Sequence, residues 1–246
     1  MRILSAVLLI SACTGPVLAL TPEEILKKVD DNQVFQTIQY SGTMVIQKGN
    51  RRKPLEKTFF AAARGKDTFY MEFTNPGDRG TKYLKLNNEL WIKGTYAERA
   101  DKISGHTLRE SMMGSDYSYE DAMENEKLTD QYDVILLGTE KWEGKRDCYK
   151  LELTAKVKEV SYYRQVIWVD QERFLGLKVQ LFALSKKLLK EMTVLDIKEI
   201  KGRMFPVEIK MENKQHRNSY TLFRTKDVQL DEPLSDSFFS KQQLEK

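Results

Sequence analysis

The stretch Thr81–Lys93, TKYLKLNNELWIK, has the pattern of a β-hairpin. Leu84 and Leu86 flank Lys85 before the Asn pair, and Leu90 and Ile92 recur two residues apart after it. Period-2 alternation is typical of strands that bury one face. Asn87 and Asn88 suit a two-residue turn, because asparagine tolerates positive φ. The pattern therefore predicts two antiparallel strands, 80–86 and 89–93.

Similar alternating segments follow each other along most of the chain and are joined by short turns, such as Glu143-Gly144-Lys145 and Lys201-Gly202-Arg203. Short joins favour an antiparallel meander over parallel strands. A long antiparallel sheet twists and cannot stay flat. We therefore expect a mainly-β fold: a curled, unclosed half-barrel of about 11–12 strands, with an N-terminal helix and a short lid helix in its open side. The predicted strands are 38–48, 55–63, 67–75, 80–86, 89–93, 132–140, 146–154, 162–170, 174–184, 188–200, 204–212 and 219–230.

Helical signals are few. Residues 21–24 read TPEE, which suits a helix start because Thr can cap it and Pro and acidic residues favour its first turn. We expect this helix to run to about Phe35. A second helix is predicted to start at Ser118, with Asp121 as its capping-box partner. A third is expected within 235–244.

Segment 97–132 interrupts the strand pattern and contains the second predicted helix. A segment of this length is long for a plain connection, and such inserts are often functional. We therefore interpret it as a lid or plug of the half-barrel.

The N-terminus has the pattern of a secretory leader. Arg2 precedes the apolar run 3–10, and Val17-Leu18-Ala19 suits cleavage after Ala19. A competing pattern, Ile10-Ser11-Ala12-Cys13, resembles a lipobox that would attach the chain to a membrane through Cys13. We expect a signal peptide over 1–19, a single binding domain over 20–246 and a periplasmic location; the alternative is a lipid-anchored form. Cleavage after Ala19 would leave Cys148 as the only thiol.

Composition excludes several classes of protein. The 246 residues include 40 Lys and Arg and 36 Asp and Glu, so the formal net charge is only +4. Because charges of both signs are interleaved, no focused field for nucleic acid results. With 41% hydrophobic and 31% charged residues, the chain is neither disordered nor integral to a membrane. Weak attraction to an anionic membrane surface remains compatible with this charge.

The sequence contains no catalytic constellation. Only two His are present, His106 and His216, and the metalloprotease, nucleophile-elbow and dinucleotide motifs are absent. Asp116, Glu120 and Asp121 cluster, but turn and helix-cap roles explain carboxylates in this pattern. The chain is therefore interpreted as a non-enzyme without metal or cofactor, and a carboxylate hydrolase using Asp116 and Glu120 is a minor alternative.

Two motifs carry a resemblance to a known family. RGTKYLKLNNELW over 79–91 and MMGSDYSYEDAM over 112–123 resemble the LolA/LolB-like outer membrane lipoprotein-sorting proteins. The resemblance implies a half-barrel with an apolar cavity for acyl chains, and a role in lipoprotein sorting or lipid transfer. The chain departs from the family pattern after Ile92, where relatives have Pro and an arginine-rich stretch.

Strand alternation predicts which side chains line such a cavity. Methionines of the insert would serve as an adaptable plug. The expected partners are lipid or lipoprotein acyl chains, an inner-membrane transporter and, transiently, a membrane, with the protein itself a monomer. A non-carrier interaction or sensor module of the same fold is the alternative function. The predicted lipid-binding residues are Phe69, Met71, Phe73, Leu84, Leu86, Leu90, Ile92, Met112, Met113, Leu177, Val179 and Leu181.

Overall fold

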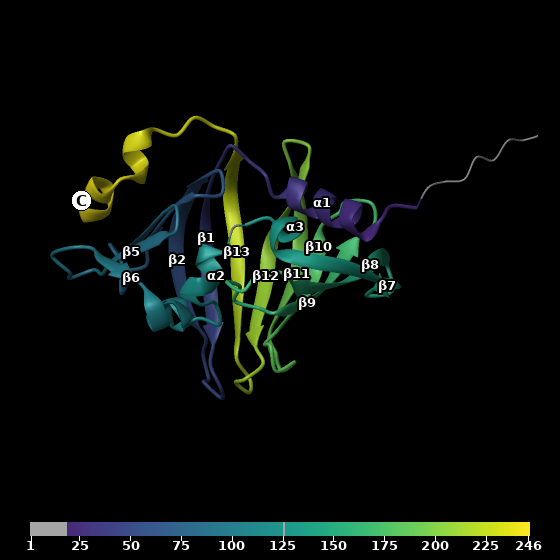
Figure 1. Cartoon of the computed structure of the whole chain (residues 1–246). Coiled ribbons are helices and arrows are strands. Elements are labelled where there is room, and N and C mark those ends of the chain that lie inside the picture. Colours follow the sequence, from purple (N-terminus) through teal and green to yellow (C-terminus); the bar gives the residue numbers. More distant parts are fainter. Residues whose placement is uncertain (1–18, 125) are drawn as a thin grey trace, which may run out of the picture.

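The computed structural model describes residues 19–124 and 126–246. Its strands form one thirteen-stranded antiparallel sheet (Figure 1). Two meanders, β1 to β6 and β7 to β13, join where β1 pairs with β13, so that β6 and β7 are the free edges. The strands are β1 (Thr37–Gln47), β2 (Leu55–Arg64), β3 (Thr68–Phe73), β4 (Lys82–Leu86), β5 (Glu89–Lys93), β6 (Asp101–Ile103), β7 (Tyr132–Trp142), β8 (Arg146–Ala155), β9 (Arg164–Asp170), β10 (Gly176–Phe182), β11 (Leu188–Ile200), β12 (Arg203–Asn213) and β13 (Tyr220–Leu230).

The first two predicted helices begin where expected. At α1 (Pro22–Asn32), the Thr21 hydroxyl accepts from the Glu24 N–H (3.2 Å) and the Glu24 carboxylate accepts from the Thr21 N–H (2.8 Å). At α2 (Tyr119–Met123), Ser118 and Asp121 form the predicted capping box. The remaining helices are α3 (Leu128–Gln131), α4 (Lys241–Glu245) and the 3-10 segments Gly105–Arg109, Met112–Gly114 and Asp236–Phe239.

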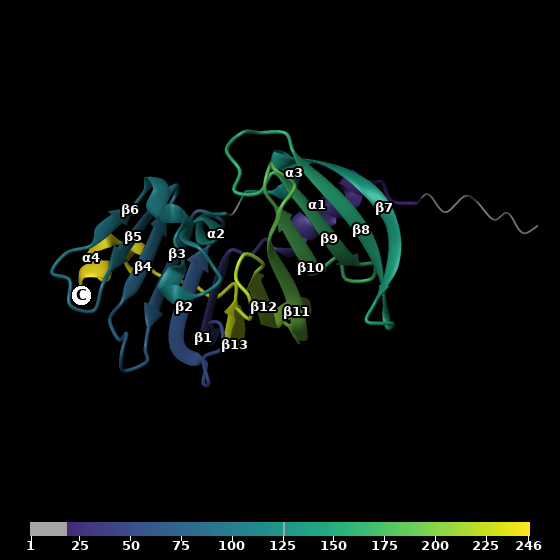
Figure 2. The same cartoon turned by 90° about the horizontal axis from the view of Figure 1, so that it is seen from below.

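The sheet curls without closing, and α1, α2 and α3 lie toward its open side (Figure 2). We call this concave side the inner face. Met44, Phe223, Ile209 and Val194 face each other across the pairings of β1, β13, β12 and β11. This row shows that the inner face continues from one meander into the other.

Helix α1 and the segment between β6 and β7 cover different parts of the inner face. The apolar side of α1 packs Ile25, Leu26 and Val29 against β7, β8 and β9. The segment 104–131, called the insert below, packs apolar residues of its 108–123 part against β1 to β5. Asp30 links the two, because its carboxylate accepts from the N–H groups of Leu128 and Thr129 (both 3.0 Å).

The outer, convex face is covered near the C-terminus. After β13 the chain crosses to β2–β5, seen as the yellow segment in Figure 1, and packs Phe239 and Leu244 against Tyr70 and Leu84. A separate outer cluster joins Cys148, Val166, Trp168 and Leu177 on β8, β9 and β10.

The half-barrel prediction is confirmed, with small differences in its elements. Strand β6 lies inside the segment predicted to lack strands, because three residues are too few for an alternation to be recognised. Helix α1 ends at Asn32 rather than near Phe35, and 235–244 divides into a 3-10 turn and α4. The expected leader and the lipidation at Cys13 lie outside the described residues. Within the residues described, no helix is long and apolar enough to cross a membrane.

Candidate functional site

The inner face of β1–β5 carries a dense apolar cluster. Its buried members come from these strands, from Ile103 of β6 and from Met112 of the insert. Partly buried side chains, Ile92 and Met113 among them, complete its margin. The predicted lining residues that lie in this cluster are Phe69, Met71, Phe73, Leu90, Ile92, Met112 and Met113.

Two further predicted residues lie on the inner face of the second meander. Val179 packs against the α1 cluster. Leu181 is buried and pairs with Lys190 on β11 and Gln165 on β9. The structure thus distributes the inner predicted residues over both meanders.

The expectation that Leu84 and Leu86 face inward is wrong. Both pack on the outer face beneath the C-terminal segment. The two-residue turn pairs Leu84 with Trp91, and Tyr83 with Ile92. Cross-strand partners share a face, so Tyr83 lies on the inner face with Ile92 and Leu84 lies on the other. The two-residue turn in the sequence already indicated that Leu84 and Ile92 lie on opposite faces, but not which of these faces is the inner one.

Leu177 also lies on the outer face, where it packs in the Cys148 cluster. The register between β10 and β9 shifts here, since Gly176 pairs with Val169 and Lys178 with Trp168. Leu177 is the extra residue of this bulge, and a bulge breaks the period-2 alternation. Simple alternation from Val179 therefore assigned Leu177 to the wrong face.

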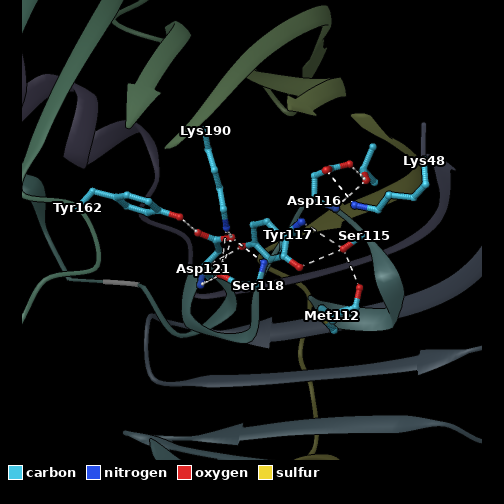
Figure 3. Close-up of polar contacts among 10 residues, drawn as sticks. Lys48, Met112, Ser115, Asp116, Tyr117, Ser118, Asp121, Tyr162 and Lys190 are labelled. Atoms are coloured by element: carbon cyan, nitrogen blue, oxygen red, sulfur yellow. Dashed lines mark hydrogen bonds and ion pairs between the residues drawn. The ribbon is translucent and has the colours of Figure 1, made fainter. Parts of the chain in front are cut away.

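Asp116 fastens the insert to β1 and β13 (Figure 3). This residue is only 2% exposed, and its carboxylate accepts from Lys48 Nζ (3.0 Å), Ser219 Oγ (2.6 Å) and Thr221 Oγ1 (2.9 Å). The Asp116 N–H donates to Thr221 Oγ1 (2.9 Å). A buried carboxylate needs several donors to offset its desolvation, and this set supplies three.

Asp121 fastens the same insert to the second meander (Figure 3). It accepts from the Ser118 N–H (2.7 Å) and Oγ (2.8 Å), from Lys190 Nζ on β11, and from the Tyr162 hydroxyl (2.5 Å) before β9. Burial raises the pKa of the Tyr162 phenol, and the neighbouring Asp121 carboxylate adds to the rise. The hydroxyl therefore remains a donor at neutral pH.

Aromatic contacts also hold the insert on the inner face. The Tyr117 ring lies 5.6 Å from Phe223 of β13, and its hydroxyl donates to the Asp121 carbonyl (3.0 Å). The Tyr119 ring lies 5.9 Å from Tyr83 of β4. The motif predicted to form a lid or plug is thus held on the inner face by two carboxylates and two aromatic rings.

The Lys85 amine lies beneath the C-terminal end of α2. Its side chain is 2% exposed, and Nζ donates to the Met123 carbonyl (2.8 Å) and the Lys66 carbonyl (3.4 Å). A cation is favourable at a helix C-terminus. Desolvation nevertheless lowers the pKa of this amine to about 8.

A strip of half-buried apolar side chains crosses the centre of the inner face between the two clusters. It takes one residue from each of five neighbouring strands, β1, β13, β12, β11 and β10. Four of the five are not among the predicted lining residues, although Val207-Glu208-Ile209-Lys210-Met211 alternates clearly in the sequence. This inner strip consists of Tyr40, Phe223, Ile209, Met192 and Val179.

The two buried aspartates of the insert have structural partners. Asp116 and Asp121 are fully engaged as anchors by donors on different strands. Among the described residues, no group of three or more His, Cys, Asp or Glu side chains could hold a metal ion. A polar pocket of about 610 Å³ lies at the turns between β1 and β2 and between β12 and β13, outside the inner strip.

An open, curled antiparallel sheet with helices and an insert on its concave side is the LolA-like fold. A LolA superfamily protein from Nitrosomonas europaea matches with a TM-score of 0.74 and 24% identity, covering 92% of this chain and 100% of that one. An outer membrane lipoprotein-sorting protein domain from Vibrio parahaemolyticus matches with a TM-score of 0.80 and 23% identity, covering 92% and 98%. At these identities the likeness establishes the fold.

The family of the chain follows from its sequence. A family model described as an uncharacterized protein matches residues 65–246, and the chain belongs to that family. A DUF1329 family protein from Desulfovibrio piger, of known structure, is 28% identical with a TM-score of 0.82, covering 91% of this chain and 97% of that one. No curated protein matches the chain.

Proposed function

We propose that this protein is a non-enzymatic carrier that binds acyl chains of lipids or lipoproteins along the inner strip. The half-buried apolar strip across five strands of a LolA-like sheet carries this proposal. Neighbouring strands lie about 4.8 Å apart, so the strip is about 19 Å long. Each methylene that leaves water contributes about 0.8 kcal/mol, and a strip of this length accommodates most of a long acyl chain.

The insert would regulate access to the strip. Tyr117 lies over Phe223, one member of the strip, and the Asp116 and Asp121 anchors hold the insert on either side. The cluster beneath the insert includes Met44, Met71 and Met112. Methionine adapts to irregular shapes, so these side chains suit a surface that exchanges a plug for a ligand.

The setting of this activity is the bacterial envelope. The leader pattern over 1–19 supports export, and a solved protein of the same fold is described as an outer membrane lipoprotein-sorting protein domain. Residues 20–246 would act as one binding domain in the periplasm, or tethered through Cys13. The client would be transferred to the outer membrane, and an inner-membrane transporter is a candidate donor.

The test compares two variants on β11. Met192→Asp places a carboxylate in the inner strip, whereas Leu195→Asp places one at a position that is 49% exposed. Binding of a fluorescent long-chain fatty acid and of a triacylated lipopeptide is titrated, and native lipids are extracted for mass spectrometry. We expect Met192→Asp to weaken binding at least about tenfold, since a bound acyl chain would cover an unpaired carboxylate, which is costly. Binding that is absent from the wild type, or equal in both variants, would contradict the proposal.

A second candidate function is a docking module, and the edge strand β7 favours it. Ile135, Leu136 and Leu137 are 55%, 41% and 47% exposed. An exposed apolar edge can pair with an extended segment of another chain. A photo-crosslinker at residue 136 tests this candidate: one specific envelope protein crosslinked there, and lost in Ile135→Lys, would support it.

A further inference from the structure

Three turns at one end of the sheet concentrate positive charge. They are residues 48–53, 183–187 and 214–219, which we call the basic rim (Figure 1). The rim contains eight Lys and Arg and no Asp or Glu. Because the whole chain has a formal charge of +4, all remaining residues together carry −4. The net positive charge of this protein is therefore concentrated in these three turns.

Hydrogen bonds between side chains join the three turns of the basic rim into one surface. Asn218 Nδ2 donates to Asn50 Oδ1 (3.1 Å), which joins the β12–β13 turn to the β1–β2 turn. Lys187 Nζ donates to Gln215 Oε1 (3.4 Å), which joins the β10–β11 turn to the β12–β13 turn. The turns lie side by side because their strands are neighbours in the sheet.

Most cations of the basic rim have no acidic partner. Lys48 pairs with Asp116, and Lys214 pairs with Glu191 and Glu212. Within the part of the chain that the structure describes, the other six are exposed and form no ion pair. These six are Arg51, Arg52, Lys53, Lys186, Lys187 and Arg217.

An apolar side chain projects from the same surface. Leu184 lies in the β10–β11 turn, two residues before Lys186, and is 70% exposed. Basic residues around an exposed apolar side chain suit the interface of an anionic bilayer, where the cations meet lipid phosphates and the apolar group enters the acyl boundary. A nucleic acid would use the cations but would gain little from an exposed leucine.

We propose that the basic rim is a docking surface for an anionic lipid bilayer. This inference rests on the rim itself and not on acyl binding by the inner strip. The rim also lies where the insert is anchored, since Lys48 and Ser219 both donate to Asp116. Docking therefore places the anchored side of the insert next to the membrane.

The experiment measures binding of the full-length protein to vesicles of phosphatidylcholine with and without phosphatidylglycerol, by cosedimentation at low and high salt. The rim variant Arg51→Gln, Arg52→Gln, Lys53→Gln is compared with Lys145→Gln, Lys198→Gln, Lys226→Gln. Both triple variants lose three exposed cations, but the control positions lie away from the rim. We expect salt-sensitive binding that requires phosphatidylglycerol and falls on the order of 100-fold in the rim variant only.

Leu184→Ser separates a bilayer from other polyanions. It should weaken vesicle binding about tenfold and leave binding of heparin or DNA unchanged. The proposal is overturned by equal losses in both triple variants, by no binding to anionic vesicles, or by binding to DNA alone. Fatty-acid titration of the rim variant in solution keeps the two proposals apart, because acyl binding should persist when docking is lost.

Discussion

Removing the Asp121 carboxylate is expected to release the insert from the second meander. In Asp121→Ala, the Lys190 ammonium stays buried without its counter-ion, and the donors of Ser118 and Tyr162 lose their acceptor. The ion-pair side chains are only 10% and 5% exposed. Breaking such a buried pair from one side costs about 3–5 kcal/mol, so we expect a loss of that order in the free energy of unfolding.

Urea unfolding followed by tryptophan fluorescence measures this loss, and hydrogen exchange of the insert locates it. The matched control is Asp31→Ala, which removes an exposed pair between Lys27 and Asp31 (69% and 49% exposed) and should leave the free energy of unfolding close to that of the wild type, because solvent screens such a pair. In Asp121→Ala, Lys190→Met the unpaired charge is gone, so we expect part of the stability to return. A loss below about 1 kcal/mol in Asp121→Ala, with unchanged exchange of the insert, would refute the reasoning.

Three further perturbations test other parts of the fold. The Lys85 amine has a pKa of about 8 in the folded protein, below its ordinary 10.5. Between these pH values the unfolded chain binds more protons than the folded one, so the free energy of unfolding should rise with pH there, by up to about 3 kcal/mol. Urea titrations at several pH values should show this rise in the wild type, and its persistence in Lys85→Met would contradict this origin. Gly42→Ala brings a Cβ to 2.4 Å from the buried Phe59 ring and should lower the free energy of unfolding by about 2 kcal/mol. The double variant Gly42→Ala, Phe59→Leu should recover part of this stability. An unchanged melting temperature in Gly42→Ala would show that the ring moves freely. Leu244→Ala opens a cavity under the C-terminal segment and should lower the free energy of unfolding by about 2–4 kcal/mol without weakening fatty-acid binding. A parallel loss of binding would mean that the outer cluster contributes to the site.

The sequence by itself determined the local structure of this protein. Alternation and turn residues predicted the antiparallel meander, and the capping residues at Thr21 and Ser118 predicted where α1 and α2 begin. These features depend on neighbours within a few residues, so one chain contains all the information. The curl of a long sheet followed from its twist, without knowledge of any particular contact.

Tertiary structure decided which face each strand presents and what holds the insert. Leu177 turned outward because of a bulge, and Leu84 faces the C-terminal segment, which lies far away in the sequence. The partners of Asp116 and Asp121 come from strands distant along the chain, so their anchoring roles depend on which strands pair. The inner strip and the basic rim likewise arise only when β1 pairs with β13, because that pairing brings the two meanders together as one surface.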